Sequence, residues 1–153
     1  MLRRVIRLVA PLLMVGCLPF VGPNDDGVFD HVSARALWNA NGVSNYTVDM
    51  RTVCFCVGAG YWKRFTVRAN VVTSIVRLDT GTPEPLAVDP PVGAPVDVAF
   101  DLVDDAVRVD ASQFSAAYHP RWGFPVRASI DFSAGVADDE IQFELANFSP
   151  LSR

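Results

Sequence analysis

The chain is poor in the side chains from which catalytic and metal centres are usually built. Its 153 residues include only three cysteines and two histidines, His31 and His119. It contains no HExxH zinc motif, no glycine-rich phosphate loop and no serine nucleophile elbow. Carboxylate pairs can be chosen at will among 17 acidic residues, so they indicate no hydrolase. We therefore expect no enzymatic activity, no cofactor and no metal.

Basic charge is also scarce, and nearly all of it is arginine, since Lys63 is the lone lysine. The formal net charge is −4 at pH 7. An acidic chain repels phosphate backbones, which argues against nucleic acid as a partner.

No apolar run approaches the roughly 20 residues that span a bilayer as a helix. The run at residues 8–15 is short, follows Arg3, Arg4 and Arg7, and leads into Gly16 and Cys17, which is the layout of a signal peptide. A cysteine directly after the small residue resembles a bacterial lipobox, which implies cleavage before Cys17 and lipidation of that cysteine. An ordinary cleaved signal with an incidental cysteine is the alternative.

These features predict three segments: a signal peptide at residues 1–16, a lipidated tether at 17–27 and a single domain at 28–153. The predicted anchor is a membrane, reached through several acyl chains on Cys17, because one chain alone binds only marginally. We expect a cell-envelope location. If the host has two membranes, Leu18 after the lipidated cysteine favours the outer one, facing the periplasm, by analogy with known sorting.

Hydrophobic periodicity predicts an α+β fold. The expected helices are residues 28–40 and 96–107. The expected strands are 46–56, 61–69, 71–78, 112–118, 126–132 and 140–145, with a proline-rich connection at 79–95. The order is α-βββ-α-βββ, which predicts an antiparallel sheet of about six strands with two helices covering one face.

The same periodicity predicts which side chains face the core. In the first strand one alternate set should face the core and the other, which includes Asp49, should face away from it. The core-facing set is Tyr46, Val48, Met50, Thr52, Cys54 and Cys56. The predicted apolar stripe of the first helix consists of Val28, Phe29, Val32, Ala36 and Leu37.

Three motifs, at residues 45–47 leading into 54–56, at 118–125 running into 130–131, and at 138–140, together resemble domain of unknown function 6174. This is a family of small, often lipid-anchored bacterial proteins. The resemblance spans residues 38–148 and implies the fold and the anchor, but no activity. The family usually has Asp where this chain has His119.

Cys54 and Cys56 are the cysteines that remain if Cys17 carries lipid. On a flat strand such residues lie about 6.5–7 Å apart at Cα, at the limit for a disulfide, so a bond requires a bend. The alternatives are a disulfide, two buried thiols, a redox pair or a soft-metal site. Two thiolates are too few for a closed metal site, and C-x-x-C is the more usual redox motif.

The segment between the fourth and fifth predicted strands is the candidate contact loop for an envelope protein partner, because Trp, Tyr and Arg are favoured at interfaces. Its residues are Tyr118, His119, Arg121, Trp122 and Phe124. The alternative is that Gly123 makes the turn while the aromatic side chains cap the core. The acids at 138–140 are better explained as a solvated turn than as calcium ligands.

These observations predict a non-catalytic binding or envelope-structural module. A thiol or soft-metal protein that uses Cys54 and Cys56 is one rival hypothesis. An inhibitor of an envelope enzyme is the other, and it rests on fold analogy.

Overall fold

The structure is a computed structural model and describes residues 31–86 and 93–152. The predicted signal peptide, Cys17 and the tether lie outside the described residues, as do residues 28–30 of the first predicted helix. Within the described ranges, no helix has the length and apolar character needed to cross a bilayer.

The predicted order α-βββ-α-βββ is confirmed. The elements are α1 (His31–Asn41), β1 (Tyr46–Val53), β2 (Lys63–Arg68), β3 (Val71–Arg77), α2 (Pro95–Arg108), β4 (Gln113–Tyr118), β5 (Pro125–Asp131) and β6 (Glu140–Pro150).

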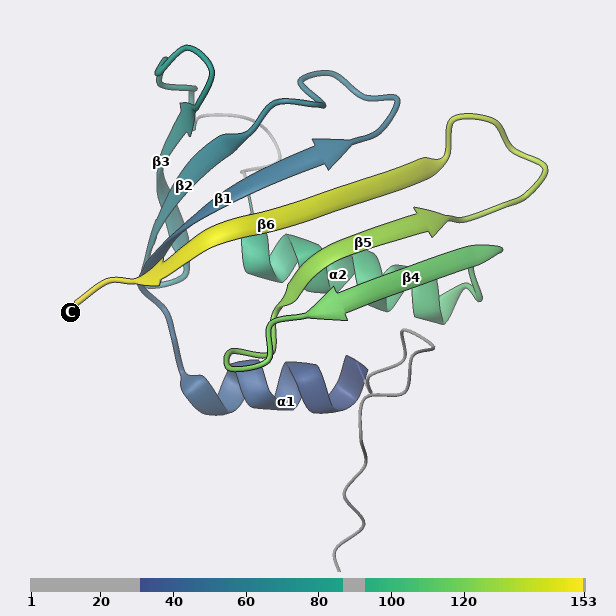
Figure 1. Cartoon of the computed structure of the whole chain (residues 1–153), viewed down its shortest axis with the longest axis horizontal. Coiled ribbons are helices and arrows are strands. Elements are labelled where there is room, and N and C mark those ends of the chain that lie inside the picture. Colours follow the sequence, from purple (N-terminus) through teal and green to yellow (C-terminus); the bar gives the residue numbers. More distant parts are fainter. Residues whose placement is uncertain (1–30, 87–92, 153) are drawn as a thin grey trace, which may run out of the picture.

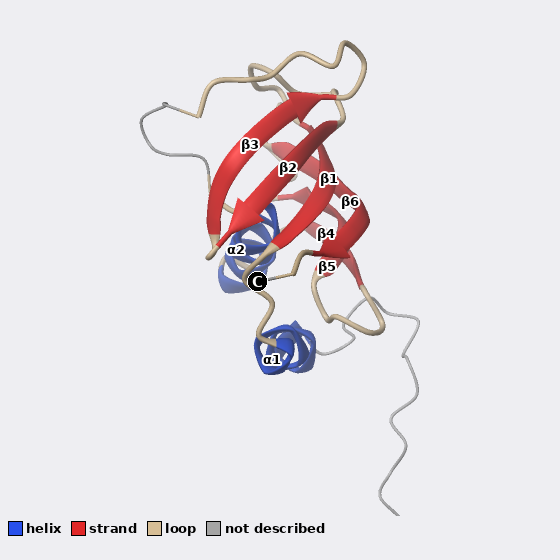
Figure 2. Ribbon diagram, turned by 90° about the vertical axis from the view of Figure 1, so that its left-hand side faces the viewer, coloured by secondary structure: helices blue, strands red, loops and turns tan. Residues whose placement is uncertain are grey.

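The strands form one antiparallel sheet in the order β3-β2-β1-β6-β5-β4. The first and last strands of the chain are thus the two central strands of the sheet, and each three-stranded half is a meander. Both helices lie on the same side of the sheet (Figures 1 and 2), which leaves its other face open. An antiparallel sheet tolerates this arrangement because its alternating side chains give one apolar face and one polar face.

The core lies between the helices and the sheet. Tyr46, Val48 and Met50 of β1 are buried there as predicted. The same prediction is wrong for the cysteines, because β1 ends at Val53 and Cys56 is exposed, while Thr52 is half-buried. Phe143 and Leu145 of β6 lie beside the buried β1 residues in the same cluster. Helix α2 contributes the largest set of helical core residues: Val96, Ala99, Phe100, Val103 and Ala106.

The predicted stripe of the first helix is wrong over the described residues. Val32 is 72% exposed and Leu37 is 37% exposed, whereas Ala34 and Trp38 are the buried residues of α1. The ring of Trp38 packs edge-on against Phe124 at 5.8 Å. The ring of Trp38, which also contacts Tyr46 and Phe148, and one small residue that permits close approach therefore orient this helix, rather than its aliphatic side chains.

Candidate functional site

The structure joins Cys54 and Cys56 by a disulfide. Strand β1 ends at Val53, three residues earlier than predicted, because the chain bends through the two cysteines. The bend brings their Cα atoms to 5.2 Å, well below the separation on a flat strand. Residues 54–60, here called the disulfide loop, then return to the sheet, where the Gly60 amide donates to the Thr52 carbonyl oxygen at 2.7 Å.

The disulfide loop points apolar side chains into solvent. Phe55 is 83% exposed and Val57 is fully exposed, while Val53 at the end of β1 is 46% exposed. Gly58 and Gly60 both have positive φ, +81° and +85°, which only glycine adopts at little cost and which keeps the loop tight. The loop is therefore a short projection with an apolar tip, and the disulfide closes its base.

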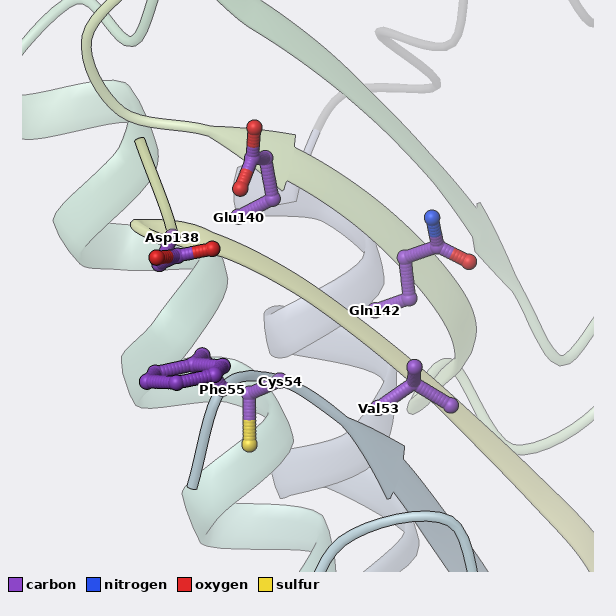
Figure 3. Close-up of a pocket in the computed structure, with 6 residues that line it drawn as sticks. All are labelled: Val53, Cys54, Phe55, Asp138, Glu140 and Gln142. Atoms are coloured by element: carbon purple, nitrogen blue, oxygen red, sulfur yellow. The ribbon is translucent and has the colours of Figure 1, made fainter. Parts of the chain in front are cut away.

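A hollow of about 310 Å³ lies beside this loop (Figure 3). Val53, Cys54 and Phe55 form one wall. The other wall comes from β6 and the segment before it, and its residues are Asp138, Glu140 and Gln142. The strand register brings the two walls together, because Val53 pairs with Gln142 where β1 ends and β6 begins. In Figure 3 the ring of Phe55 and the side chain of Asp138 lie on the two facing walls of the hollow.

Acidic side chains gather at this wall, which holds Asp138 and Glu140, and beside it. Residues 131–140, here called the acidic turn, connect β5 to β6 and carry Asp131, Asp138, Asp139 and Glu140. Burial raises the pKa of Asp139, and the charges of Asp131 and Glu140 raise it further. One oxygen of Asp139, Oδ1, is buried with no hydrogen-bond partner. No group of three or more His, Cys, Asp or Glu side chains within residues 31–86 and 93–152 is arranged to hold a metal ion.

The predicted contact loop is packed against the rest of the protein instead of projecting into solvent. Residues 119–124, here called the packed turn, rest on α1 (Figure 1). Phe124 is 1% exposed, so its inclusion in a contact surface is wrong. The half-buried ring of Trp122 packs 5.5 Å from Phe148, and Arg121 lies over that ring at 4.7 Å. The packing alternative therefore describes this turn.

Gly123 allows the close approach of the packed turn to α1. Its φ is +83°, and a Cβ there would collide with the Ala34 carbonyl oxygen and lie 2.9 Å from the Trp38 amide nitrogen. Any larger residue would push the turn away from the helix. The glycine thus fixes a helix contact in addition to making the turn.

His119 organises the inside of the packed turn. Its Nδ1 accepts hydrogen bonds from the backbone N–H groups of Arg121 at 3.2 Å and Trp122 at 3.3 Å. Burial lowers the pKa of His119, and the nearby Arg121 charge lowers it further. The neutral ring that results has the lone pair that these two N–H groups need. A carboxylate at this position could accept the same two bonds.

His31 joins three elements. Its Nδ1 lies 3.0 Å from the Tyr118 hydroxyl on β4, and its Nε2 bonds Asp104 on α2. Arg35, one turn further along α1, bonds the same Asp104 carboxylate. These bonds attach the start of α1 to both α2 and the sheet.

The open face of the sheet holds a buried carboxylate that sequence reasoning missed. Asp49 faces away from the helices as predicted, yet it is only 1% exposed. Arg64 forks onto it at 2.7 and 2.8 Å, and Asn147 donates to it at 2.8 Å. Burial alone would raise the pKa of Asp49, but the bonds from Arg64 and Asn147 and the Arg64 charge outweigh it, so the pKa lies below its usual value.

A second hollow, of about 500 Å³, adjoins Asp49 on the open face. Tyr61, Trp62 and Leu78 supply its apolar lining. Arg77 lies over Tyr61 at 3.8 Å and pairs with Asp79, and Arg51 lies over Trp62 at 5.2 Å. Local sequence carries no signal for this arrangement, because Arg64 and Asn147 reach Asp49 only when β2 and β6 pair with β1.

Comparison with known proteins gives one family match. The model of a family described as a family of unknown function (DUF6174) matches residues 30–150. This match covers the whole described fold, including the disulfide loop and the acidic turn. No curated protein and no solved structure matches the chain.

Proposed function

The chain belongs to the DUF6174 family of unknown function, and we propose that it is a lipid-anchored, non-catalytic binding module of the cell envelope. Its contact surface is the disulfide loop, residues 54–60. The observation that carries the proposal is the exposure of Phe55, at 83%, and of Val57, which is fully exposed. Exposed apolar side chains gathered at one place favour an interaction site, whereas single ones are ordinary.

The disulfide loop suits this role because its shape is fixed before any partner arrives. The Cys54–Cys56 bond and the Gly60–Thr52 hydrogen bond hold the base of the loop. Little conformational entropy is then lost when Phe55 is covered, and a larger share of the contact energy becomes binding affinity.

The histidine and cysteine side chains that a catalytic site would use are engaged in structural contacts, which supports a non-catalytic role. His119 accepts backbone hydrogen bonds inside the packed turn, and His31 bonds Tyr118 and Asp104. Cys54 and Cys56 are joined to each other, which weighs against the thiol and soft-metal hypothesis.

The anchor is tested at Cys17, which lies outside the described residues. Replacing Cys17→Ser should remove the lipid, so the protein should leave the membrane fraction or accumulate as the uncleaved precursor. Membrane fractionation and intact mass measurement check this. Unchanged partitioning with an unchanged mature mass would contradict the lipid anchor.

The contact surface is tested by site-specific photo-crosslinking of the full-length protein in its own host. A photoreactive residue at position 57 should give a discrete protein adduct, and Phe55→Ser in the same chain should reduce that adduct several-fold. The control is a photoreactive residue at Val107, which is 55% exposed on α2. A third variant carries the photoreactive residue at Arg121 of the packed turn. Equal adduct yields at positions 57 and 107, or an adduct at position 121 alone, would place the contact surface elsewhere.

A further inference from the structure

The charge of the hollow beside Phe55 indicates what kind of partner fits it. All four carboxylates of the acidic turn lack a basic partner among the described residues, whereas seven other acid–base pairs are formed there. Among the nearby cations, Lys63 pairs with Glu84 at 2.8 Å and Arg51 pairs with Glu144 at 2.9 Å. The wall of the hollow is therefore left with uncompensated negative charge.

Two acids of the acidic turn, Asp138 and Glu140, line the hollow itself. Besides burial, the charge of Glu140 raises the pKa of the neighbouring Asp139, so negative charge is concentrated on this side of the hollow. A cation placed in the hollow would lie against Asp138 and Glu140 and offset their charge. No anionic or neutral group would do so.

The opposite wall is apolar. Phe55 and Val53 line the hollow, and the exposed side chains of Val57 and Val136 lie on the two loops that flank it. An aromatic face next to carboxylates is a favourable setting for a guanidinium or ammonium group, because the ring attracts the cation while the carboxylates bond it. The stem of a long basic side chain would cover the apolar wall.

We propose that the hollow between the disulfide loop and the acidic turn receives an arginine or lysine side chain, flanked by apolar residues, from a protein partner. This inference rests on the proposed binding function and specifies its partner. A volume of about 310 Å³ accommodates such a side chain. A membrane is the less favoured occupant of the same surface, since the acids would face the negative headgroups of envelope lipids.

The test uses the mature lipoprotein in detergent and a pair of fluorescent capped octapeptides. One carries two arginines flanked by valines, and in the other citrulline replaces both arginines, which keeps the shape and removes the charge. The arginine peptide should bind at least tenfold more tightly by fluorescence anisotropy, and added salt should weaken it. Equal binding of the two peptides would overturn the inference.

Two double variants locate the charge. Asp138→Asn with Glu140→Gln should abolish the difference between the peptides. The control is Asp101→Asn with Asp110→Asn, which removes the same amount of charge from α2 and the residues after it. It should leave the difference in affinity between the two peptides intact. A difference that survives the first double variant would overturn the inference.

The remaining outcomes separate this inference from the proposed function. If Phe55→Ser lowers the crosslinking at position 57 while neither peptide binds, the binding function stands and the basic partner is wrong. If Phe55→Ser changes neither crosslinking nor peptide binding, the proposed function itself fails. Crosslinking of position 57 to acyl chains in phosphatidylcholine vesicles would identify a membrane as the occupant and overturn the inference.

Discussion

The disulfide loop and the packed turn lie at opposite ends of one sheet and have opposite environments (Figure 1). Each carries at least one aromatic residue and at least one glycine with φ above +80°. Phe124 of the packed turn is 1% exposed, whereas Phe55 of the disulfide loop is 83% exposed. The difference comes from α1, which covers the end of the sheet with the packed turn and leaves the other end open. Aromatic content therefore marks neither loop as a contact surface until the helix is placed.

Replacing Phe124→Ala should have the largest effect on stability. This ring packs 4.7 Å from Phe148 and 5.8 Å from Trp38, so its removal leaves a cavity in the aromatic core. We expect a loss of about 3–5 kcal/mol in the free energy of unfolding. Phe55→Ala, the matched control, should change it by less than about 0.5 kcal/mol. Urea denaturation of both variants checks this, and similar losses would show that the two rings are equally buried in solution.

A second pair of variants separates backbone strain from packing. Gly60 and Gly123 have nearly the same φ, +85° and +83°, but a Cβ at Gly60 would meet nothing within 4 Å. Gly60→Ala should therefore lower the free energy of unfolding only by the strain of alanine in the left-handed conformation, about 1–2 kcal/mol. Gly123→Ala should cost a further 1–3 kcal/mol or so, because α1 must move to accommodate the methyl group. Thermal unfolding measures both, and equal shifts in Tm would mean that the packed turn does not press on α1.

The architecture of this protein could be predicted because it depends on local patterns. The alternation in β1 placed Tyr46, Val48 and Met50 in the core, and the helix predicted at 96–107 matches the bounds of α2, Pro95–Arg108, within a residue at each end. The end of β1 was missed because the bend at Cys54 depends on a bond between side chains, which periodicity does not register.

The candidate site was harder to predict because it depends on which segments meet. Asp49 is one of the alternate residues of β1 that face away from the core. Nothing in the neighbouring sequence indicates that Arg64 and Asn147 will enclose it. Likewise, the hollow beside Phe55 exists because β6 begins where β1 ends, which brings residues 138–142 next to residues 53–55. The sequence could offer Cys54 and Cys56 as a feature, but the acidic wall facing them required the sheet topology.

Removing the disulfide should have a smaller effect than either change to the packed turn. The bond closes a ring of only three residues, so it restricts little of the unfolded chain, and the chain-entropy relation gives about 1–2 kcal/mol. The bond is also remote from the packed turn and cannot hold α1 in place. Cys54→Ser with Cys56→Ser should therefore lower the free energy of unfolding by that amount at most, as measured by urea denaturation, and leave near-ultraviolet circular dichroism unchanged. A loss as large as that from Phe124→Ala would assign the disulfide a global role.

The smallest expected effect concerns the pH dependence of the packed turn. Because the pKa of His119 is lowered on folding, its contribution to stability is fully present above the unfolded value of about 6.5 and is lost as the pH falls through the folded value. Protonation removes the lone pair that accepts the two backbone N–H groups, which is worth about 0.5–1.5 kcal/mol. His119→Asp should keep those bonds and stay ionised down to about pH 4, so it should lack this dependence. The measurement is the difference in unfolding free energy between wild type and variant at pH 7.5 and 5.5. Contributions from residues other than 119 are common to both proteins and cancel, so a difference that does not change with pH would show that His119 does not support the turn as an acceptor.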